Sequence, residues 1–296
     1  MITYPKISIV TPSYNQVDFL EQTIRSILSQ GYPNLEYIII DGGSSDGSVE
    51  IIKKYDSSLA YWETAKDEGM YHALNKGFSK STGEIMGWTN SDDVLAEGAL
   101  FTMADLFSRN KKVEWIQGYP TVINVEGKIV FQRPQVYSKY FFFLHQYRNY
   151  QFIQQESTFW KRGLWLKSGG ELDTQFSVAA DFDLWMRFFL HAKLYCTDKQ
   201  LGAFRSRQGQ LSQNKERYLK EASVSVKKNY QQLGILDQWL VRGLLFFDRG
   251  GLGRASLFGR IKNKLVSLLL YRKHSLALLL FAFLFSVQGY KSSCSQ

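Results

Sequence analysis

Apolar strands that alternate with amphipathic helices through the first 110 residues constrain the fold more than any other feature of this sequence. The expected strands are residues 6–11, residues 35–41, residues 59–62 and a segment that ends at Asn90. The expected helices are residues 18–29, 49–55 and 70–79. The longer strands are nearly all apolar, which is typical of strands buried on both faces. The sequence therefore predicts an α/β fold with a mostly parallel sheet flanked by helices.

The pattern changes beyond about residue 110. Short strands are expected at residues 113–118, 120–125 and 128–132, the last two joined by a turn at residues 124–127. Residues 137–152 are rich in aromatic side chains, which we interpret as an acceptor-binding surface, while a plain core role is the alternative for most aromatics here. A helix with apolar residues at i, i+3, i+4, i+7 and i+8 begins near Asp181.

An acidic turn follows the strand that ends at Asn90. Asp92 and Asp93 are adjacent carboxylates, and they repel each other unless something neutralises them. The carboxyl ends of strands are where open α/β sheets bind ligands, and a hard divalent cation prefers oxygen ligands. Such a turn suits a metal that holds a diphosphate, although these residues alone are a weak signal for one. The alternative is turn chemistry, or an N-cap of a helix that begins at Val94 and Leu95.

Composition describes a globular protein, because 45% of the 296 residues are hydrophobic and 21% are charged. Cys196 and Cys294 are far apart and have no metal-ligand spacing, which favours a reducing compartment over a disulfide framework. The first residues have no signal-peptide pattern, so we expect the catalytic part to be cytoplasmic.

The net charge of +9 is concentrated near the C-terminus. Residues 239–296 contain nine Lys or Arg and one acidic residue, a net of +8, which leaves 27 basic and 26 acidic residues in the remainder. A neutral body argues against a nucleic-acid partner.

The basic tail is also apolar. Between residues 254 and 273, leucines, isoleucine and phenylalanine recur at helical spacing among Lys and Arg, a pattern that favours an anionic membrane surface. The apolar run at residues 276–285 is shorter than the roughly 20 residues that a membrane span needs. We predict an anchor that lies on the membrane or re-enters it; the alternative is a helical hairpin packed on the body or on a partner.

Six segments, taken together and in order, resemble the family 2 glycosyltransferases, which have a GT-A fold. They are Ile9–Asn15 (IVTPSYN), Ile40–Gly47 (IDGGSSDG), Asp67–Gly69 (DEG), Asn75–Gly77 (NKG), Asn90–Asp93 (NSDD) and Ala180–Trp185 (ADFDLW). The resemblance covers about residues 5 to 210. It is strongest to bacterial members that build O-antigen, capsule or exopolysaccharide.

The resemblance implies a donor site and a metal site. Pro12 and Tyr14 would border the nucleobase, and Asp41 would accept a hydrogen bond from a base N–H. Asp92 would bind Mn²⁺ or Mg²⁺, with Asp93 either helping or only capping the next helix; Asn90 replaces the first aspartate of the family motif. The full set of implied donor-binding residues is Thr11, Pro12, Tyr14, Asn15, Asp41, Asp67, Gly69, Asn75, Lys76, Asn90, Ser91 and Arg207.

The resemblance also implies that Asp181 is the general base, in preference to Asp183, which lies on another side of the same helix. Residue spacing alone leaves an N-cap role for Asp181 open. Arg207 occupies the position where related sequences often have a histidine. A guanidinium cannot bind metal, but its fork suits a diphosphate; a solvent-exposed loop arginine is the alternative.

The expected function is an inverting, metal-dependent hexosyltransferase. It would move sugar from a UDP-, GDP- or dTDP-sugar to a glycan acceptor, expected to be lipid-linked, at the inner face of the cell membrane. Residues 1–110 would form the nucleotide-sugar-binding half, residues 111–230 the acceptor-binding and catalytic half, and residues 231–296 the membrane-associating tail. The alternatives are a sugar nucleotidyltransferase and a non-catalytic nucleotide- or glycan-binding subunit.

Overall fold

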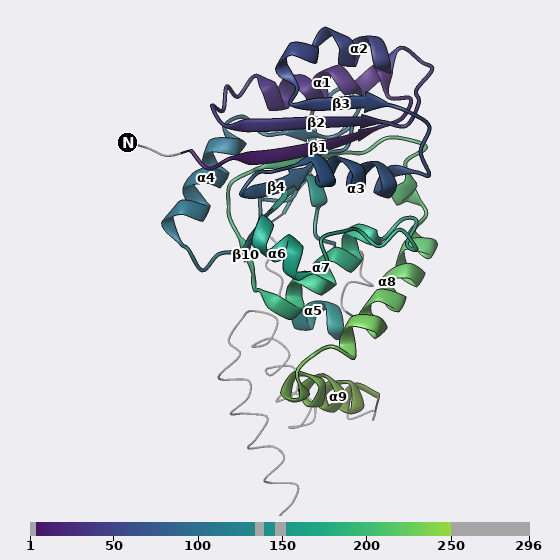
Figure 1. Ribbon diagram of the computed structural model, residues 1–296. Helices are drawn as coiled ribbons and strands as arrows, with labels where there is room; N and C mark the ends of the chain where they lie inside the picture. The colour runs from purple at the N-terminus through teal and green to yellow at the C-terminus, as the bar shows by residue number, and fades with distance from the viewer. Residues whose placement is uncertain (1–3, 134–138, 146–151, 250–296) are drawn as a thin grey trace, which may run out of the picture. The chain divides into compact units, whose positions relative to one another are not determined.

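The computed structural model describes residues 4–133, 139–145 and 152–249 (Figure 1). The chain forms two compact units. The larger unit comprises Met1–Gln135 and Phe152–Ser225, and the smaller comprises Val136–Gln151 and Val226–Gln296. All of the described residues discussed below as site residues belong to the larger unit.

A seven-stranded sheet forms the centre of the larger unit, in the order β10-β6-β9-β4-β1-β2-β3. Its strands are β1 (Ile7–Ser13), β2 (Leu35–Asp41), β3 (Tyr61–Thr64), β4 (Ile85–Trp88), β6 (Trp115–Gln117), β9 (Thr158–Lys161) and β10 (Leu194–Cys196). Neighbouring strands are parallel except at β9, which is antiparallel to both β4 and β6. The predicted mostly parallel α/β sheet is confirmed.

Helices cover both faces of this sheet (Figure 1). They are α1 (Val17–Leu28), α2 (Ser48–Lys54), α3 (Met70–Lys80), α4 (Ala99–Arg109), α6 (Arg162–Lys167) and α7 (Ala180–His191). Buried residues of α1, α2 and α4 form one core with Ile7, Ile9 and Ile39 of the sheet. Helix α3 packs on the opposite face, against β1 and β2. Side chains alternate along a strand, so consecutive residues of β1 and β2 supply the two cores.

Gly77 explains how closely α3 approaches the sheet. A Cβ atom at this position would lie 2.4 Å from Cγ1 of Val10 and 3.3 Å from Cγ1 of Ile40. Any larger residue would therefore push the helix away from β1. Because α3 begins at the edge of the sheet where β1 and β2 end, this contact also fixes the position of its first residues, Met70 and Tyr71.

Aromatic side chains fill the core between the sheet and α7. Trp88, Trp115, Trp160 and Trp185 are all at most 2% exposed. Trp185 stacks on Trp88, with ring centroids 5.7 Å apart and an interplanar angle of 9°. These four tryptophans are core residues, and they pack α7 against β4.

A second sheet, in the order β5-β11-β7-β8, contains several of the short strands. It consists of β5 (Val94–Leu95), β7 (Thr121–Ile123), β8 (Ile129–Gln132) and β11 (Gly202–Arg205). The hairpin expected at residues 120–132 is present, with β7 antiparallel to β8. The idea that the acidic turn caps a helix at Val94 and Leu95 is wrong, because these residues form β5 and the next helix begins at Ala99.

Helix α8 (Lys215–Tyr230) runs from the larger unit into the smaller one, which also contains α5 (Lys139–Phe143) and α9 (Ile235–Arg249). Within the smaller unit, Asp237 of α9 is paired with Lys139 and accepts a hydrogen bond from the Tyr140 hydroxyl. No helix in the described part of the chain is long and apolar enough to cross a membrane. The predicted amphipathic segment at 254–273 and the apolar run at 276–285 lie outside the described residues.

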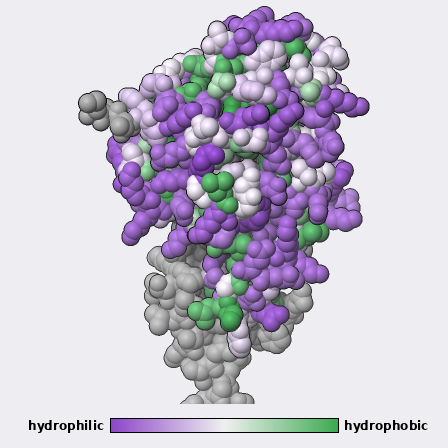
Figure 2. Space-filling view, viewed as in Figure 1, coloured by the Kyte–Doolittle hydropathy of each residue, from purple (hydrophilic) through white to green (hydrophobic). Residues whose placement is uncertain are grey.

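Figure 2 shows that the visible face of the larger unit is mostly hydrophilic, with apolar residues in small scattered patches. Its apolar side chains are used in the two cores on either side of the sheet.

Candidate functional site

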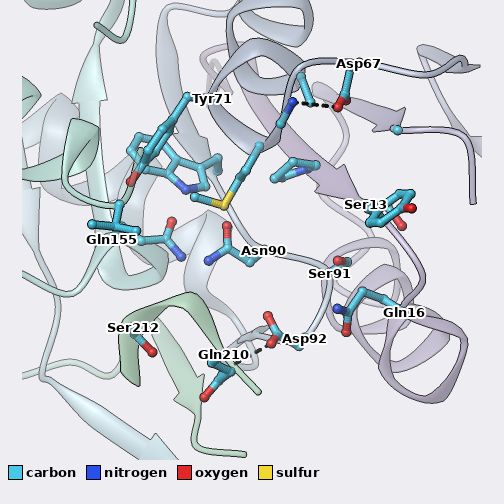
Figure 3. A pocket seen from close by; sticks show the side chains of 18 of the residues that line it. Ser13, Gln16, Asp67, Tyr71, Asn90, Ser91, Asp92, Gln155, Gln210 and Ser212 are labelled. Carbon is cyan, nitrogen blue, oxygen red and sulfur yellow. Dashed lines mark hydrogen bonds between the residues drawn. The ribbon is translucent and has the colours of Figure 1, made fainter. Parts of the chain in front are cut away.

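A cavity of about 710 Å³ opens at the carboxyl ends of β1, β2 and β4 (Figure 3). Pairing of β1 with β2 sets Ser13 opposite Asp41, and β4 leads directly into residues 89–93. The start of α3, the start of α7 and residues 207–212 complete the walls. This volume is typical of small-molecule sites, and its place at the sheet edge is where open α/β folds bind ligands.

Nine of the residues predicted for the site line this cavity, and six do not. The nine are Pro12, Tyr14, Asp67, Gly69, Asn90, Ser91, Asp92, Asp181 and Arg207. The six are Thr11, Asn15, Asp41, Asn75, Lys76 and Asp93. The residues of the second group hold the segments around the cavity in place, as the contacts of each residue indicate.

Asp41 organises the glycine-rich turn that follows β2. Its carboxylate is fully buried and accepts hydrogen bonds from the amides of Gly43 and Ser44 and from the hydroxyls of Ser44 and Thr64, at 2.5–3.0 Å. The expected contact with a nucleobase is not supported by this placement, because the acceptor oxygens are already occupied. Gly42 and Gly43 line the cavity instead.

The remaining supporting residues hold neighbouring segments. The Thr11 hydroxyl lies 3.1 Å from the Tyr37 hydroxyl in the core. Asn15 has a φ of 49° and accepts a hydrogen bond from the Ser45 amide. Asn75 exchanges two hydrogen bonds with the backbone of Leu172. Lys76 pairs with Glu63 on β3. These contacts direct the four side chains away from the cavity.

Of the two aspartates in the acidic turn, Asp92 is the one that reaches the cavity. Its Oδ2 accepts hydrogen bonds from Arg207 Nε at 2.9 Å and from Gln210 Nε2 at 3.0 Å. Arg207 also donates to Gln16 Oε1 at 3.0 Å. Arg207 is therefore a cavity residue, and the alternative of a solvent-exposed loop arginine is wrong. Its position beside Asp92 brings a fixed positive charge to the place where a diphosphate is expected.

Asp93 faces the opposite way and is fully buried. Its Oδ1 accepts a hydrogen bond from the backbone amide of Arg205 at 2.8 Å, and its Oδ2 lies 3.2 Å from side-chain nitrogens of Asn90 and Gln155. Burial raises the pKa of Asp93 well above its usual value, and the neighbouring Asp92 carboxylate raises it further. Asp93 thus supports the acidic turn from behind.

Arg205 ties the acidic turn to two other segments, residues 124–125 and helix α1. Its guanidinium is fully buried and donates to the backbone carbonyls of Asp92, Asn124 and Val125 and to Gln22 Oε1, at 2.6–3.0 Å. Sequence reasoning gave Arg205 no role, because an arginine in a polar segment is usually exposed. Its position on β11, two residues before Arg207, places the two guanidiniums on the inner and outer sides of the same turn.

The acidic turn offers a divalent cation one available carboxylate oxygen. Asp92 Oδ1 has no hydrogen-bond donor among the described residues, so it is available as a ligand. Mg²⁺ is commonly held by only one or two carboxylates together with substrate phosphates and water. Across residues 4–133, 139–145 and 152–249, no three His, Cys, Asp or Glu side chains gather as a ready-made metal cage. A cation here would be shared between Asp92 and the ligand.

Asp181 lines the far wall of the cavity from the first turn of α7. The residue before the helix, Ala179, is the N-cap, so the suggestion that Asp181 serves as a plain cap is wrong. The Tyr218 hydroxyl lies 3.3 and 3.4 Å from the two carboxylate oxygens. Burial raises the pKa of Asp181 to about 6, although hydrogen bonds from the Phe182 amide and Tyr218 oppose this rise. Such a group can take up a proton near neutral pH.

Asp183, two residues along α7, has a different environment. It is fully buried, forms an ion pair with Arg187 at 2.8 Å, and accepts a hydrogen bond from the Ser225 hydroxyl at 2.7 Å. The expectation that Asp181 and Asp183 face different sides of the helix is confirmed. Asp183 fastens α7 to its neighbours, while Asp181 faces the cavity.

Several cavity residues were missed by the sequence reasoning. They are Ser13, Gln16, Lys66, Met70, Tyr71, Trp88, Gln155, Gln210, Ser212 and Tyr218. Ser13 lies within the quoted motif Ile9–Asn15 and Gln16 directly follows it, which was a usable signal. Gln155 and Tyr218 come from segments without a recognisable pattern, and only the folded chain brings them to the site.

Comparison with known proteins identifies the family of the chain. The model of the family "Glycosyl transferase family 2" matches residues 8–163. The chain belongs to this family. It is 29% identical over 203 residues to an uncharacterized glycosyltransferase of Mycobacterium tuberculosis, covering 66% of this chain and 72% of that one. It is 32% identical over 128 residues to the poly-beta-1,6-N-acetyl-D-glucosamine synthase of Staphylococcus epidermidis, covering 42% and 31%. This glycosyltransferase is thus related to polysaccharide-synthesising enzymes.

Solved structures confirm the GT-A fold. TarS 1–349 of S. aureus, in complex with UDP-GlcNAc, superposes with a TM-score of 0.65 at 16% identity, covering 87% of this chain and 78% of that one. The mannosyltransferase PcManGT of Pyrobaculum calidifontis, in complex with GDP-Man and Mn²⁺, gives a TM-score of 0.57 at 16% identity, covering 99% and 89%. The predicted family and fold are both confirmed.

Proposed function

We propose that this glycosyltransferase is an inverting, metal-dependent hexosyltransferase that moves a sugar from a nucleotide-sugar donor to a glycan acceptor. The observation that carries the proposal is the single cavity that Asp92, Arg207 and Asp181 share. Asp92 and Arg207 suit a diphosphate at one wall, and Asp181 suits a base at another. The ligands of TarS and PcManGT, which are nucleotide sugars, support the same class of donor.

The reaction needs one group to accept a proton and others to stabilise a leaving group. The acceptor hydroxyl oxygen forms a bond to the anomeric carbon while its proton passes to Asp181. The bond from that carbon to the diphosphate breaks, and the nucleoside diphosphate departs with the electron pair. Arg207 and Lys66 line the cavity and offer positive charge to it. A divalent cation bound with Asp92 would supply further charge neutralisation at the diphosphate.

The acceptor is proposed to be lipid-linked, and the protein to associate peripherally with the inner face of the cell membrane. The net charge of +8 in residues 239–296 supports attraction to an anionic membrane surface. In the smaller unit, Ile235, Leu236 and Trp239 of α9 are 74%, 74% and 69% exposed. Exposed large apolar side chains of this kind suit insertion between lipid headgroups. We also propose that the glycan being built is an O-antigen, a capsule or an exopolysaccharide.

Calorimetric titration of UDP, GDP and dTDP, each with and without Mn²⁺, tests the donor class. We expect one nucleotide to bind, and Mn²⁺ to tighten its binding at least about tenfold, because a cation held by Asp92 would neutralise charge on the diphosphate. The Asp92→Asn variant should retain the metal-independent part of the affinity and lose the increase. If the folded protein binds none of the three nucleotides, a nucleotide-sugar transferase is excluded.

The pH dependence of transfer should report the pKa of Asp181. The base is active only when ionised, so we expect kcat/KM to fall as the pH decreases through about 6. The hydrogen bond from Tyr218 lowers the pKa of Asp181. Tyr218→Phe should therefore move the acidic limb of the profile to higher pH, which is measured from initial rates between pH 5 and 9.

The matched control for Tyr218→Phe is Tyr55→Phe. Tyr55 also donates a hydrogen bond to a carboxylate, that of Glu21 at 2.9 Å, but it does not line the cavity. This control should leave the pH profile unchanged. An acidic limb that stays in place in Tyr218→Phe would show that another group controls the profile.

A further inference from the structure

Two amide side chains from separate parts of the chain meet at one wall of the cavity. Asn90 follows β4, and Gln155 begins the short 3-10 helix Gln155–Ser157. The nitrogen atoms Asn90 Nδ2 and Gln155 Nε2 both lie 3.2 Å from Asp93 Oδ2. Figure 3 shows the two amides beside each other in the region between Tyr71 and Asp92. Their common acceptor fixes both orientations, because an amide nitrogen donates and cannot accept.

The other end of each amide has no partner. Asn90 Oδ1 and Gln155 Oε1 are buried and receive no hydrogen bond from any described residue. Even a protonated Asp93 would carry one hydrogen, which could serve only one of the two oxygens. The indole N–H of Trp88, another cavity residue, is likewise buried without an acceptor. Ser13 Oγ is a fourth such atom among the cavity residues. Buried polar atoms are normally paired, so these unpaired groups in one cavity indicate a ligand that pairs with them.

The chemistry of the two amides and the indole restricts that ligand. Two carbonyl oxygens and one N–H match hydroxyl groups, which donate and accept, and the oxygens disfavour the anionic diphosphate. Asn90 lies in the same turn as Asp92, so the wall adjoins the expected position of the diphosphate. The group bonded to the diphosphate on its reactive side is the sugar that is transferred.

We propose that Asn90 and Gln155, held by Asp93, form the subsite that recognises ring hydroxyls of the donor sugar. The proposal rests on the function proposed above and assigns Gln155 as a specificity-determining residue of the same site. Asp93 is then a positioning residue, which acts through the two amides. This explains why the second aspartate of the acidic turn is buried and directed away from the cavity.

The test compares nucleotides with and without the sugar. UDP, UDP-N-acetylglucosamine, GDP and GDP-mannose are titrated with Mn²⁺ into wild type and Gln155→Met, in the absence of acceptor. Methionine keeps the length of the side chain and removes the carbonyl oxygen. We expect the affinity for the sugar nucleotide to fall about tenfold, as for a lost hydrogen bond, and the affinity for the free nucleoside diphosphate to stay unchanged.

Gln154→Met is the matched control. The neighbouring Gln154 bonds to the backbone of Thr121 and does not line the cavity. This variant should bind both kinds of nucleotide as wild type does. If Gln155→Met loses affinity for the nucleoside diphosphate to the same extent, the sugar subsite is wrong.

A second arm begins with wild-type protein, so its first result does not depend on the folding of a variant. Donors that lack one ring hydroxyl at a time should include at least one that binds about tenfold more weakly, and in Gln155→Met that difference should disappear. If every deoxy donor binds like its parent, or if Gln155→Met changes only the KM of the acceptor, the subsite is wrong while the proposed function stands. If wild type binds no nucleotide, both the proposed function and this subsite are refuted.

Discussion

Replacing Asp181 by asparagine should lower kcat by about 10²–10⁴-fold, because the variant keeps the shape of the side chain and loses the proton acceptor. The cavity wall that holds Asp181 is built by α7, whose position depends on the packed tryptophans rather than on this carboxylate. We therefore expect the affinity for the nucleoside diphosphate to be unchanged. Single-turnover transfer and calorimetry on the same preparation separate these two effects.

The Asp181→Asn variant should also be at least as stable as wild type above pH 7. The pKa of Asp181 is raised in the folded protein, so the protonated form is favoured by folding. That stabilisation is fully present below the usual pKa of an aspartate and is lost as the pH rises through about 6. At higher pH the ionised carboxylate costs folding free energy, and a neutral asparagine avoids this cost.

Asp183→Asn is the matched control, with the same change two residues along the same helix. Asp183 balances the charge of Arg187 in a buried ion pair, so its neutralisation should lower the free energy of unfolding. A loss of stability without loss of kcat in Asp183→Asn, beside a loss of kcat without loss of stability in Asp181→Asn, separates support from catalysis. Full transfer activity in folded Asp181→Asn would refute the assignment of the base.

The sequence predicted the sheet well because buried parallel strands have a local signature. Residues 35–41 are nearly all apolar, and they form β2 over the same bounds. The apolar spacing of residues 182–190 likewise predicted helix α7, but the role of Asp181 came only from the resemblance of Ala180–Trp185 to a family motif. Strand β9 was not predicted, because Thr158–Lys161 is short and pairs antiparallel with β4 and β6, contacts that no local pattern reveals.

The roles of individual carboxylates were harder to predict than the elements that carry them. Asp41 and Asp92 both follow strands of the same sheet, yet Asp41 is saturated by four donors while Asp92 reaches the cavity. The difference depends on how the following turn folds back, a property of several residues at once. Gln155 is a similar case, because its role depends on Asp93, 62 residues earlier in the chain.

Replacing Arg205 by methionine should lower the free energy of unfolding by about 3–5 kcal/mol, the usual range when one member of a buried charged network is removed. Four acceptors would lose their donor, three of them backbone carbonyls, and the Asp92 and Asp93 carboxylates would lose a nearby positive charge. Urea unfolding followed by tryptophan fluorescence measures the change.

Arg207→Met is the control that distinguishes the two guanidiniums. Arg207 is partly exposed and contacts Asp92 from the cavity side, so its loss should reduce stability by no more than about 1 kcal/mol while weakening nucleotide binding. Equal destabilisation by the two variants would mean that the acidic turn is held from the cavity side as much as from the core. The expected difference instead makes Arg205 the residue that holds Asp92 in place before any ligand arrives. Arg207, two residues later, then remains free to exchange Asp92 for the diphosphate.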